Sequence, residues 1–71
     1  MTATPLSHAI GANLKRIRAT TDLTQSDLAK RAGTNINYYA KLERGIAVPS
    51  LAMLEKIAKA LKVKSSEILP F

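Results

Sequence analysis

The chain has 71 residues, of which 11 are lysine or arginine and 5 are aspartate or glutamate, so its formal net charge is +6. Hydrophobic residues make up 46%, a globular composition that is too apolar for a disordered tail. The lack of cysteine excludes disulfides, thiolate metal sites and a cysteine nucleophile, and the single histidine, His8, cannot form a metal site alone. No apolar run approaches the roughly 18 to 20 residues of a membrane span, so we expect a cytoplasmic protein without a membrane partner.

The positive charge is spread along the chain instead of forming a tail. Each third of the sequence contains more basic than acidic residues. A folded basic surface fits this distribution, and nucleic acid is the polyanion that such a surface most often binds. Charge alone leaves simple solubility open as the alternative.

The first predicted helix begins near Pro5. Proline is favoured at the first helical position, and Thr4 suits the cap before it, although Ser7 is a competing cap. Apolar residues recur at helical spacing and predict one buried face, formed by Leu6, Ile10, Leu14 and Ile17.

A second helix is predicted for the segment QSDLAKRA, which follows Thr24. The Thr24 hydroxyl can accept the backbone N–H of Asp27, and Asp27 can return the bond, as in a capping box. Leu23 and Leu28 have the spacing of a hydrophobic staple. Gly33 ends this helix, because glycine adopts the left-handed cap at little cost.

Three more helices complete the expected order. Asn35 caps a short third helix that ends at Gly45, with Tyr39 and Leu42 as its inward positions. After the loop IAVP, Ser50 caps a fourth helix with a predicted buried stripe of Leu51, Leu54, Ile57, Ala58 and Leu61. The segment SSEIL adds a last turn. No stretch alternates with period two, so we expect an all-α protein with one domain over residues 1–71 and C-terminal helices at about 50–69.

The segment LTQSDLAKRAGTNINYYAKLERG, followed by VPSLAMLEKIAKALKVKSSEIL, resembles the Cro/CI-type helix-turn-helix transcription regulators, also called the XRE family. The resemblance covers residues 10–69, nearly the whole chain. Its markers are Gln25, Ala29, Gly33, Leu42, ERG at 43–45 and PSL at 49–51. It implies a compact five-helix bundle of the lambda-repressor-like DNA-binding type, with the helix-turn-helix at about 24–45. Tyr39 departs from the aliphatic residue usual in the family.

The resemblance also implies roles for side chains on the third helix. Ile36, Asn37 and Lys41 occupy the positions that most often read base edges. Asn37 can bond adenine, Lys41 can donate to guanine, and Ile36 can contact a thymine methyl group. Tyr38 is open between a base contact, a phosphate contact and packing.

Other side chains are implied to contact phosphates or to hold the third helix. The expected phosphate residues are Gln25, Thr34, Asn35, Arg44 and Arg16. Lys15 reads better as a solvated residue, and the four lysines at 56, 59, 62 and 64 are given no DNA role. Arg18 and Glu43 are expected to form a partly buried salt bridge between the first and third helices.

Family members usually bind palindromic DNA as two-fold dimers, so a homodimer interface is implied. The candidate interface residues are Ile46, Val48, Leu54, Ile68, Leu69 and Phe71, unless they cover the domain's own underside. The sequence thus predicts a sequence-specific regulator of transcription, a repressor, without cofactor or small-molecule ligand. No catalytic set is visible, so an enzyme is not expected. The alternatives are an antitoxin or other protein-interaction module, and the DNA-binding part of a longer repressor.

Overall fold

In the computed structural model, residues 4–71 are described, and within them the chain forms five α-helices and no β-strand. The helices are α1 (Pro5–Arg18), α2 (Gln25–Arg31), α3 (Ile36–Glu43), α4 (Leu51–Leu61) and α5 (Ser65–Ile68). The first three residues of the expected domain lie outside this range. The Cα radius of gyration is 10.6 Å and the principal extents are 28 × 24 × 22 Å. The predicted all-α class and helix order are confirmed.

Side-chain caps begin the first four helices. The Thr24 hydroxyl accepts the Asp27 N–H at 3.0 Å, and Asp27 accepts the Thr24 N–H at 3.0 Å, so the predicted capping box is present. Thr4 and Ser7 form a second such box at the start of α1. Ser7 is therefore the third residue of the helix, and Thr4 is the cap. Asn35 caps α3 as predicted, and Ser50 caps α4.

Two glycines end the helices that matter most for the site. Gly33 after α2 has φ of +75° and Gly45 after α3 has φ of +78°. Gly45 donates its N–H to the Leu42 carbonyl, and the next residue donates to Lys41, which satisfies the last carbonyls of α3. At the end of α4 the same left-handed conformation is taken by Lys62, with φ of +60°.

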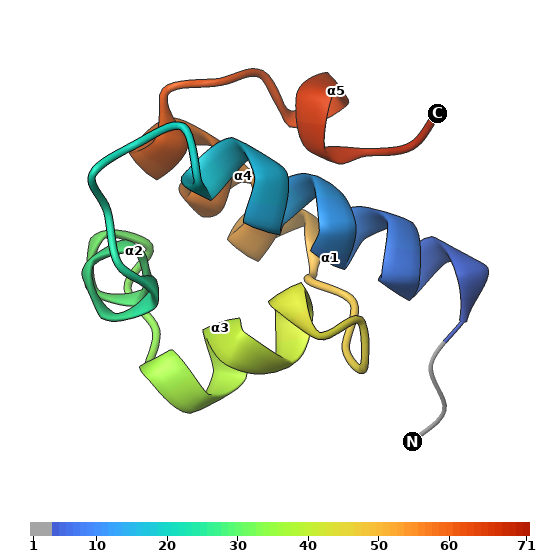
Figure 1. The fold of residues 1–71 in the computed structure, drawn as a ribbon, viewed down its shortest axis with the longest axis horizontal. Coiled ribbons are helices and arrows are strands. Elements are labelled where there is room, and N and C mark those ends of the chain that lie inside the picture. The colour runs from blue at the N-terminus through green and yellow to red at the C-terminus, as the bar shows by residue number, and fades with distance from the viewer. Residues whose placement is uncertain (1–3) are drawn as a thin grey trace.

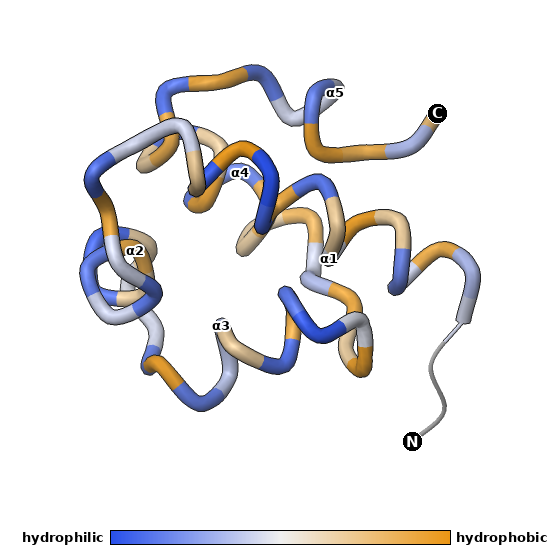
Figure 2. Tube along the Cα trace, viewed as in Figure 1, coloured by the Kyte–Doolittle hydropathy of each residue, from blue (hydrophilic) through white to orange (hydrophobic). Residues whose placement is uncertain are grey.

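The helices enclose one core (Figure 1). α3 packs against α1 and α2, α4 packs against α2 and α5, and α5 also packs against α1. The buried side chains come from all five helices and include Ile10, Leu14, Leu28, Tyr39, Leu42, Ile57 and Ile68. Hydrophobic and hydrophilic stretches alternate along α1 and α4, and the loop between α3 and α4 is largely hydrophobic (Figure 2). Among the described residues, no helix combines the length and apolarity that crossing a membrane requires.

Four apolar positions differ from the sequence-based prediction. Leu6 is 41% exposed and Leu51 is 84% exposed, although both were expected inside. They lie in the first turns of α1 and α4, on the side of each helix that faces solvent. Conversely, Leu54 and Ile68 were candidates for a dimer interface but are only 4% and 0% exposed, which confirms the other prediction for Leu54, that it belongs to the buried stripe of α4. They are corrected to core residues, because a side chain already buried within its own chain offers no area to a partner.

Candidate nucleic-acid interface

The third helix is held from beneath by three of its own residues. Tyr39 and Leu42 are fully buried, as predicted, and Glu43 is almost so. Tyr39 and Leu42 carry the hydrophobic anchorage, since each fully buried large apolar side chain contributes about 1.5–3 kcal/mol. Glu43 adds a polar anchorage that reaches two other helices.

Glu43 accepts hydrogen bonds from α1 and α2 at once. Arg18 Nε lies 2.6 Å from Glu43 Oε2, and Arg18 Nη2 lies 3.2 Å from Oε1. The expected ion pair is therefore present, with bidentate geometry. Gln25 Nε2 donates to Oε1 at 3.0 Å. Arg18 also donates to the Leu23 carbonyl at 3.2 Å, so the connection before α2 is tied to the same guanidinium.

This network shifts the pKa values of both charged partners. The hydrogen bond to Glu43 raises the pKa of Arg18 above its ordinary value. Burial by itself raises the pKa of Glu43, but the hydrogen bond from Arg18, the neighbouring Tyr39 hydroxyl and the hydrogen bond from Gln25 together outweigh burial, so the pKa of Glu43 lies below its ordinary value. The pair is charged at neutral pH and joins the C-terminal end of α3 to α1 and α2.

The Tyr39 hydroxyl is the unsatisfied atom in this region. It lies near Glu43 and Arg18, and desolvation together with the Glu43 charge raises the pKa of Tyr39. Nevertheless it forms no hydrogen bond of acceptable geometry with the described residues. The departure from an aliphatic residue therefore leaves a buried polar atom beneath the helix.

The opposite face of α3 is free of the core. Ile36 is 45% exposed, and Asn37, Lys41 and Arg44 are also exposed. Tyr38 is half-buried and packs against the edge of the core, so its aromatic ring contributes to packing. The four residues expected to read bases thus lie on one short helix, and the side chains of three of them are exposed to solvent.

The expected phosphate residues are not all on this surface. Asn35 is exposed at the N-terminus of α3, where its side chain accepts the Tyr38 N–H at 2.9 Å, and Thr34 precedes it half-buried. Gln25 stands at the N-terminus of α2, bonded to Glu43. Free N–H groups and the helix dipole favour an anion at both termini.

Arg16 is the exception among the phosphate residues. Its guanidinium donates to Asn13 Oδ1 at 3.3 Å, and the Asn13 amide donates to the Ile68 carbonyl at 2.8 Å. Arg16 is therefore directed toward the α5 side of α1, and the structure does not bring it to the α3 surface.

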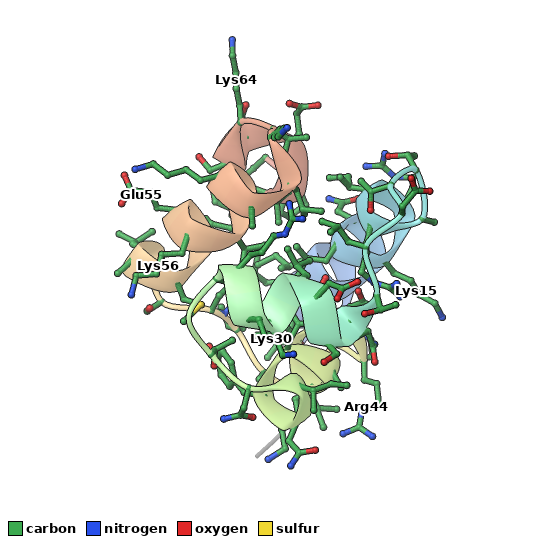
Figure 3. The ribbon with its side chains drawn as sticks, turned by 90° about the vertical axis from the view of Figure 1, so that its left-hand side faces the viewer. Lys15, Lys30, Arg44, Glu55, Lys56 and Lys64 are labelled. Carbon is green, nitrogen blue, oxygen red and sulfur yellow. The ribbon has the colours of Figure 1, made fainter. Side chains whose placement is uncertain are left out.

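Lys15 was set aside in the sequence analysis, but it projects from the same side of the molecule as Arg44 (Figure 3). The helical phase could have indicated this, because Lys15 lies one turn after Gly11 and one before Arg18, and both of these α1 residues contact the end of α3.

Comparison with known proteins decides which family has this arrangement. Residues 14–68, most of the chain, match the family model described as helix-turn-helix, HTH_3. The chain belongs to this helix-turn-helix family. Its α2 and α3 are the two helices of the motif, and the resemblance to XRE-family regulators is confirmed.

The helix-turn-helix relatives include regulators from bacteria, archaea and a phage. An HTH-type transcriptional regulator of Methanocaldococcus jannaschii is 44% identical over 55 residues, which are 78% of this chain and 83% of that protein. The immunity repressor protein of Bacillus phage phi105 is 41% identical over 59 residues, covering 83% of this chain. The chain spans only 41% of the length of that repressor and of two similar regulators from Mycobacterium tuberculosis.

A solved structure gives the same fold. The restriction-modification controller protein C.AhdI from Aeromonas hydrophila superposes with a TM-score of 0.85 at 30% identity, covering 89% of this chain and 91% of that one. The clp gene regulator ClgR from Corynebacterium glutamicum also gives 0.85, at 29% identity, covering 92% of this chain and 84% of that one. The structural similarity therefore covers nearly the whole chain and is not limited to the two helices of the motif.

Proposed function

We propose that this chain is a single DNA-binding domain of a transcription regulator, a repressor that recognises double-stranded DNA by sequence. α3 enters the major groove, and two copies bind a palindromic operator. The observation that carries the proposal is that α3 is anchored by Tyr39, Leu42 and Glu43 while Asn37 and Lys41 face solvent. A helix fixed from below with exposed polar side chains matches the geometry by which such motifs read bases. The likeness to a phage immunity repressor supports repression.

The chemistry of the exposed face suggests the bases it reads. Asn37 can form two hydrogen bonds with adenine, through N6 and N7, and Lys41 can donate to guanine O6 or N7. Ile36 offers an apolar surface to a thymine methyl group. These contacts select the sequence, whereas Arg44 and the N-termini of α2 and α3 hold the phosphate backbone and set the register.

The direct test is selection of bound duplexes from a random DNA pool at moderate salt. We expect an enriched palindrome whose half-sites lie about 34 Å apart, or roughly one helical turn. Enrichment of no sequence by the folded protein would contradict sequence recognition and favour a protein-interaction module.

A pair of lysine variants then tests which face binds. Lys41→Ala and Lys56→Ala remove the same charge, but Lys56 lies on α4, away from α3 (Figure 3). Lys41→Ala should weaken operator binding by about 1–3 kcal/mol and relax the choice at one base pair. Lys56→Ala should leave that choice intact. Equal effects of the two variants would mean that only the general positive charge matters.

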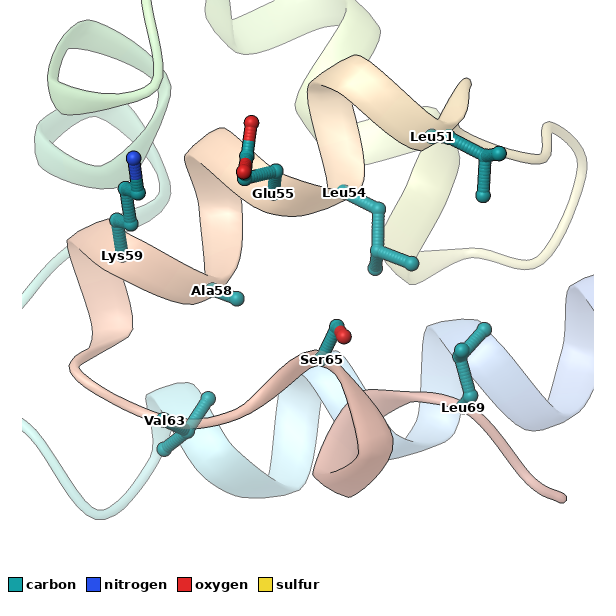
Figure 4. Close-up of a pocket in the computed structure, with 8 residues that line it drawn as sticks. All are labelled: Leu51, Leu54, Glu55, Ala58, Lys59, Val63, Ser65 and Leu69. Carbon is teal, nitrogen blue, oxygen red and sulfur yellow. The ribbon is translucent and has the colours of Figure 1, made fainter.

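We place the homodimer contact on the surface formed by α4, α5 and the loop before α4. A groove of about 320 Å³ lies between α4 and α5, where Val63 lies across from Ala58 and Leu69 across from Leu54 (Figure 4). Leu51 at its rim is 84% exposed and Phe71 is 85% exposed, and exposed apolar residues of this size favour a partner. Ile46 and Val48 are exposed on the preceding loop.

The groove also contains one charge of each sign, from Glu55 and Lys59. In a two-fold contact each of these can meet its opposite on the other copy, because an isologous interface is self-complementary. Sedimentation with operator DNA should give two chains per duplex. Leu51→Asp should reduce this to one, whereas Ala12→Asp on the exposed face of α1 should not. A dimer unaffected by Leu51→Asp would exclude this surface.

A further inference from the structure

The N-terminal half of α1 meets the C-terminal end of α3 through a contact that the sequence analysis did not predict. Ser7 is 2% exposed, and its hydroxyl donates to the Gly45 carbonyl at an Oγ–O distance of 2.6 Å. The two residues are 38 positions apart in the sequence. The same oxygen accepts the Thr4 N–H at 2.8 Å. One side chain thus completes the cap of α1 and holds Gly45, the glycine that follows the C-cap of α3.

Gly11, one turn further along α1, allows the two backbones to touch. A Cβ atom at this position would lie 2.5 Å from the Leu42 carbonyl oxygen and 2.7 Å from that of Glu43. Both oxygens belong to the backbone of α3, so no side-chain rotation can relieve the clash. An alanine would have to separate α1 from α3 by about 0.9 Å, the difference between 2.5 Å and an ordinary contact of 3.4 Å.

We infer that Ser7 and Gly11 are positioning residues for α3, which fix its C-terminal end laterally and so set where Lys41 and Arg44 meet the duplex. The inference depends on the proposed function. Ser7 holds the carbonyl of the residue that directly follows Arg44. Lys41 lies next to Leu42, one of the carbonyls that Gly11 approaches. A hydrogen bond to a base edge requires about 2.7–3.2 Å, so a displacement near 1 Å is enough to break it.

The contact has a distinct role from the Glu43 network. Arg18 and Gln25 hold a side chain, which can keep its bonds while the helix shifts slightly, because both donors are long and flexible. Ser7 and Gly11 hold the backbone of α3 itself. This contact therefore determines the position of the helix to a fraction of an ångström, and its loss should appear as reduced discrimination between sequences.

The test compares binding of three duplexes of equal length. They are the selected operator, the operator with the Lys41-dependent base pair changed, and an unrelated sequence. Ser7→Ala, Gly11→Ala and the control Ala12→Ser on the exposed face of α1 are measured at a temperature where each is shown to be folded. Ser7→Ala should lower the preference for the operator over its changed form about tenfold, Gly11→Ala at least as much, and Ala12→Ser not at all. Binding to the unrelated duplex should stay within about twofold, because it depends on charge.

A double-variant measurement separates positioning from general destabilisation. If Ser7 acts through Lys41, then Ser7→Ala in the Lys41→Ala background should cause no further loss of preference at that base pair. If Ser7→Ala fails to fold, Gly11→Ala takes its place. Ser7→Thr, which keeps the hydroxyl in an altered side chain, is the other substitute.

The inference is overturned if the folded variants weaken all three duplexes equally, or change only the melting temperature. Failure of this inference differs from failure of the proposed function. If the proposed function is wrong, the wild-type chain shows no preference among the three duplexes. If only the inference is wrong, the wild type prefers the operator and the variants prefer it equally strongly.

Discussion

Replacement of Tyr39 by phenylalanine should stabilise the protein, because it removes the one buried hydroxyl that has no partner among the described residues. Burying an unpaired hydroxyl costs about 1–3 kcal/mol. The variant loses the packing contacts of one oxygen atom, each of which contributes only about 0.1–0.2 kcal/mol. The free energy of unfolding should therefore rise by about 1 kcal/mol.

Urea and thermal denaturation measure this change directly. For a domain of this size, 1 kcal/mol corresponds to an increase of about 4–8 °C in the melting temperature. The adjacent Tyr38, which is half-buried, gives a matched control, and Tyr38→Phe should stay within about 0.5 kcal/mol of the wild type. If the hydroxyl instead donates to Glu43, Tyr39→Phe removes a bond to a charged group and should destabilise by about 1.5–3 kcal/mol. A loss of that size would refute the reasoning, since the sign of the effect differs between the two cases.

The remaining predictions concern the ion pair and the end of α4. Arg18→Ala should lower the free energy of unfolding by about 3 kcal/mol. This is near the low end for a broken buried pair, because Gln25 still donates to Glu43 and the Arg18 side chain is 21% exposed. A loss below about 1 kcal/mol in urea denaturation would contradict this prediction. The pKa of Glu43 lies below 4.5 in the folded state, so the unfolded state binds more protons near pH 4.5. The stabilisation from this group is therefore present above pH 4.5 and is lost as the pH falls through the folded-state pKa. The stability difference between wild type and Glu43→Gln should accordingly narrow below pH 4.5, and a constant difference between pH 6 and pH 3 would exclude the linkage. Lys62→Gly should raise the free energy of unfolding by about 0.5–1 kcal/mol, because a non-glycine residue in the left-handed region costs about 1–2 kcal/mol and glycine loses part of that gain to chain entropy. Lys59→Gly within the helix should instead destabilise the protein by about 1 kcal/mol. If both glycine variants change the free energy of unfolding in the same direction, the left-handed conformation of Lys62 is not the cause of the effect.

Local chemistry made the helix starts predictable from the sequence. Thr24 and Asp27 have the spacing of a capping box, and Asn35 precedes an inward pair at Tyr39 and Leu42, so these features follow from neighbours along the chain. Whether a side chain is covered is a different matter. Leu6 and Leu51 have the correct helical phase for burial, yet they lie in first turns and their side chains are exposed.

Contacts between segments that are distant in the sequence were harder to predict from the sequence. The Arg18–Glu43 pair was expected only through the family resemblance, since nothing local relates the two positions. The Ser7–Gly45 bond was missed, because Ser7 had a sufficient local explanation as a cap. Leu54 and Ile68 were assigned to an interface because the sequence gives no measure of how much volume a five-helix core requires, and the structure uses both in that core.

The separation between the two sides of α3 has an evolutionary consequence. Its attachment depends on Tyr39, Leu42 and Glu43, whereas the side chains of Asn37 and Lys41 are exposed. Exchange of these two residues therefore costs little stability, and under the proposed function a duplicated copy of the chain acquires a new target within a few mutations. The same scaffold can diversify into many regulators of different specificity without having to refold along the way.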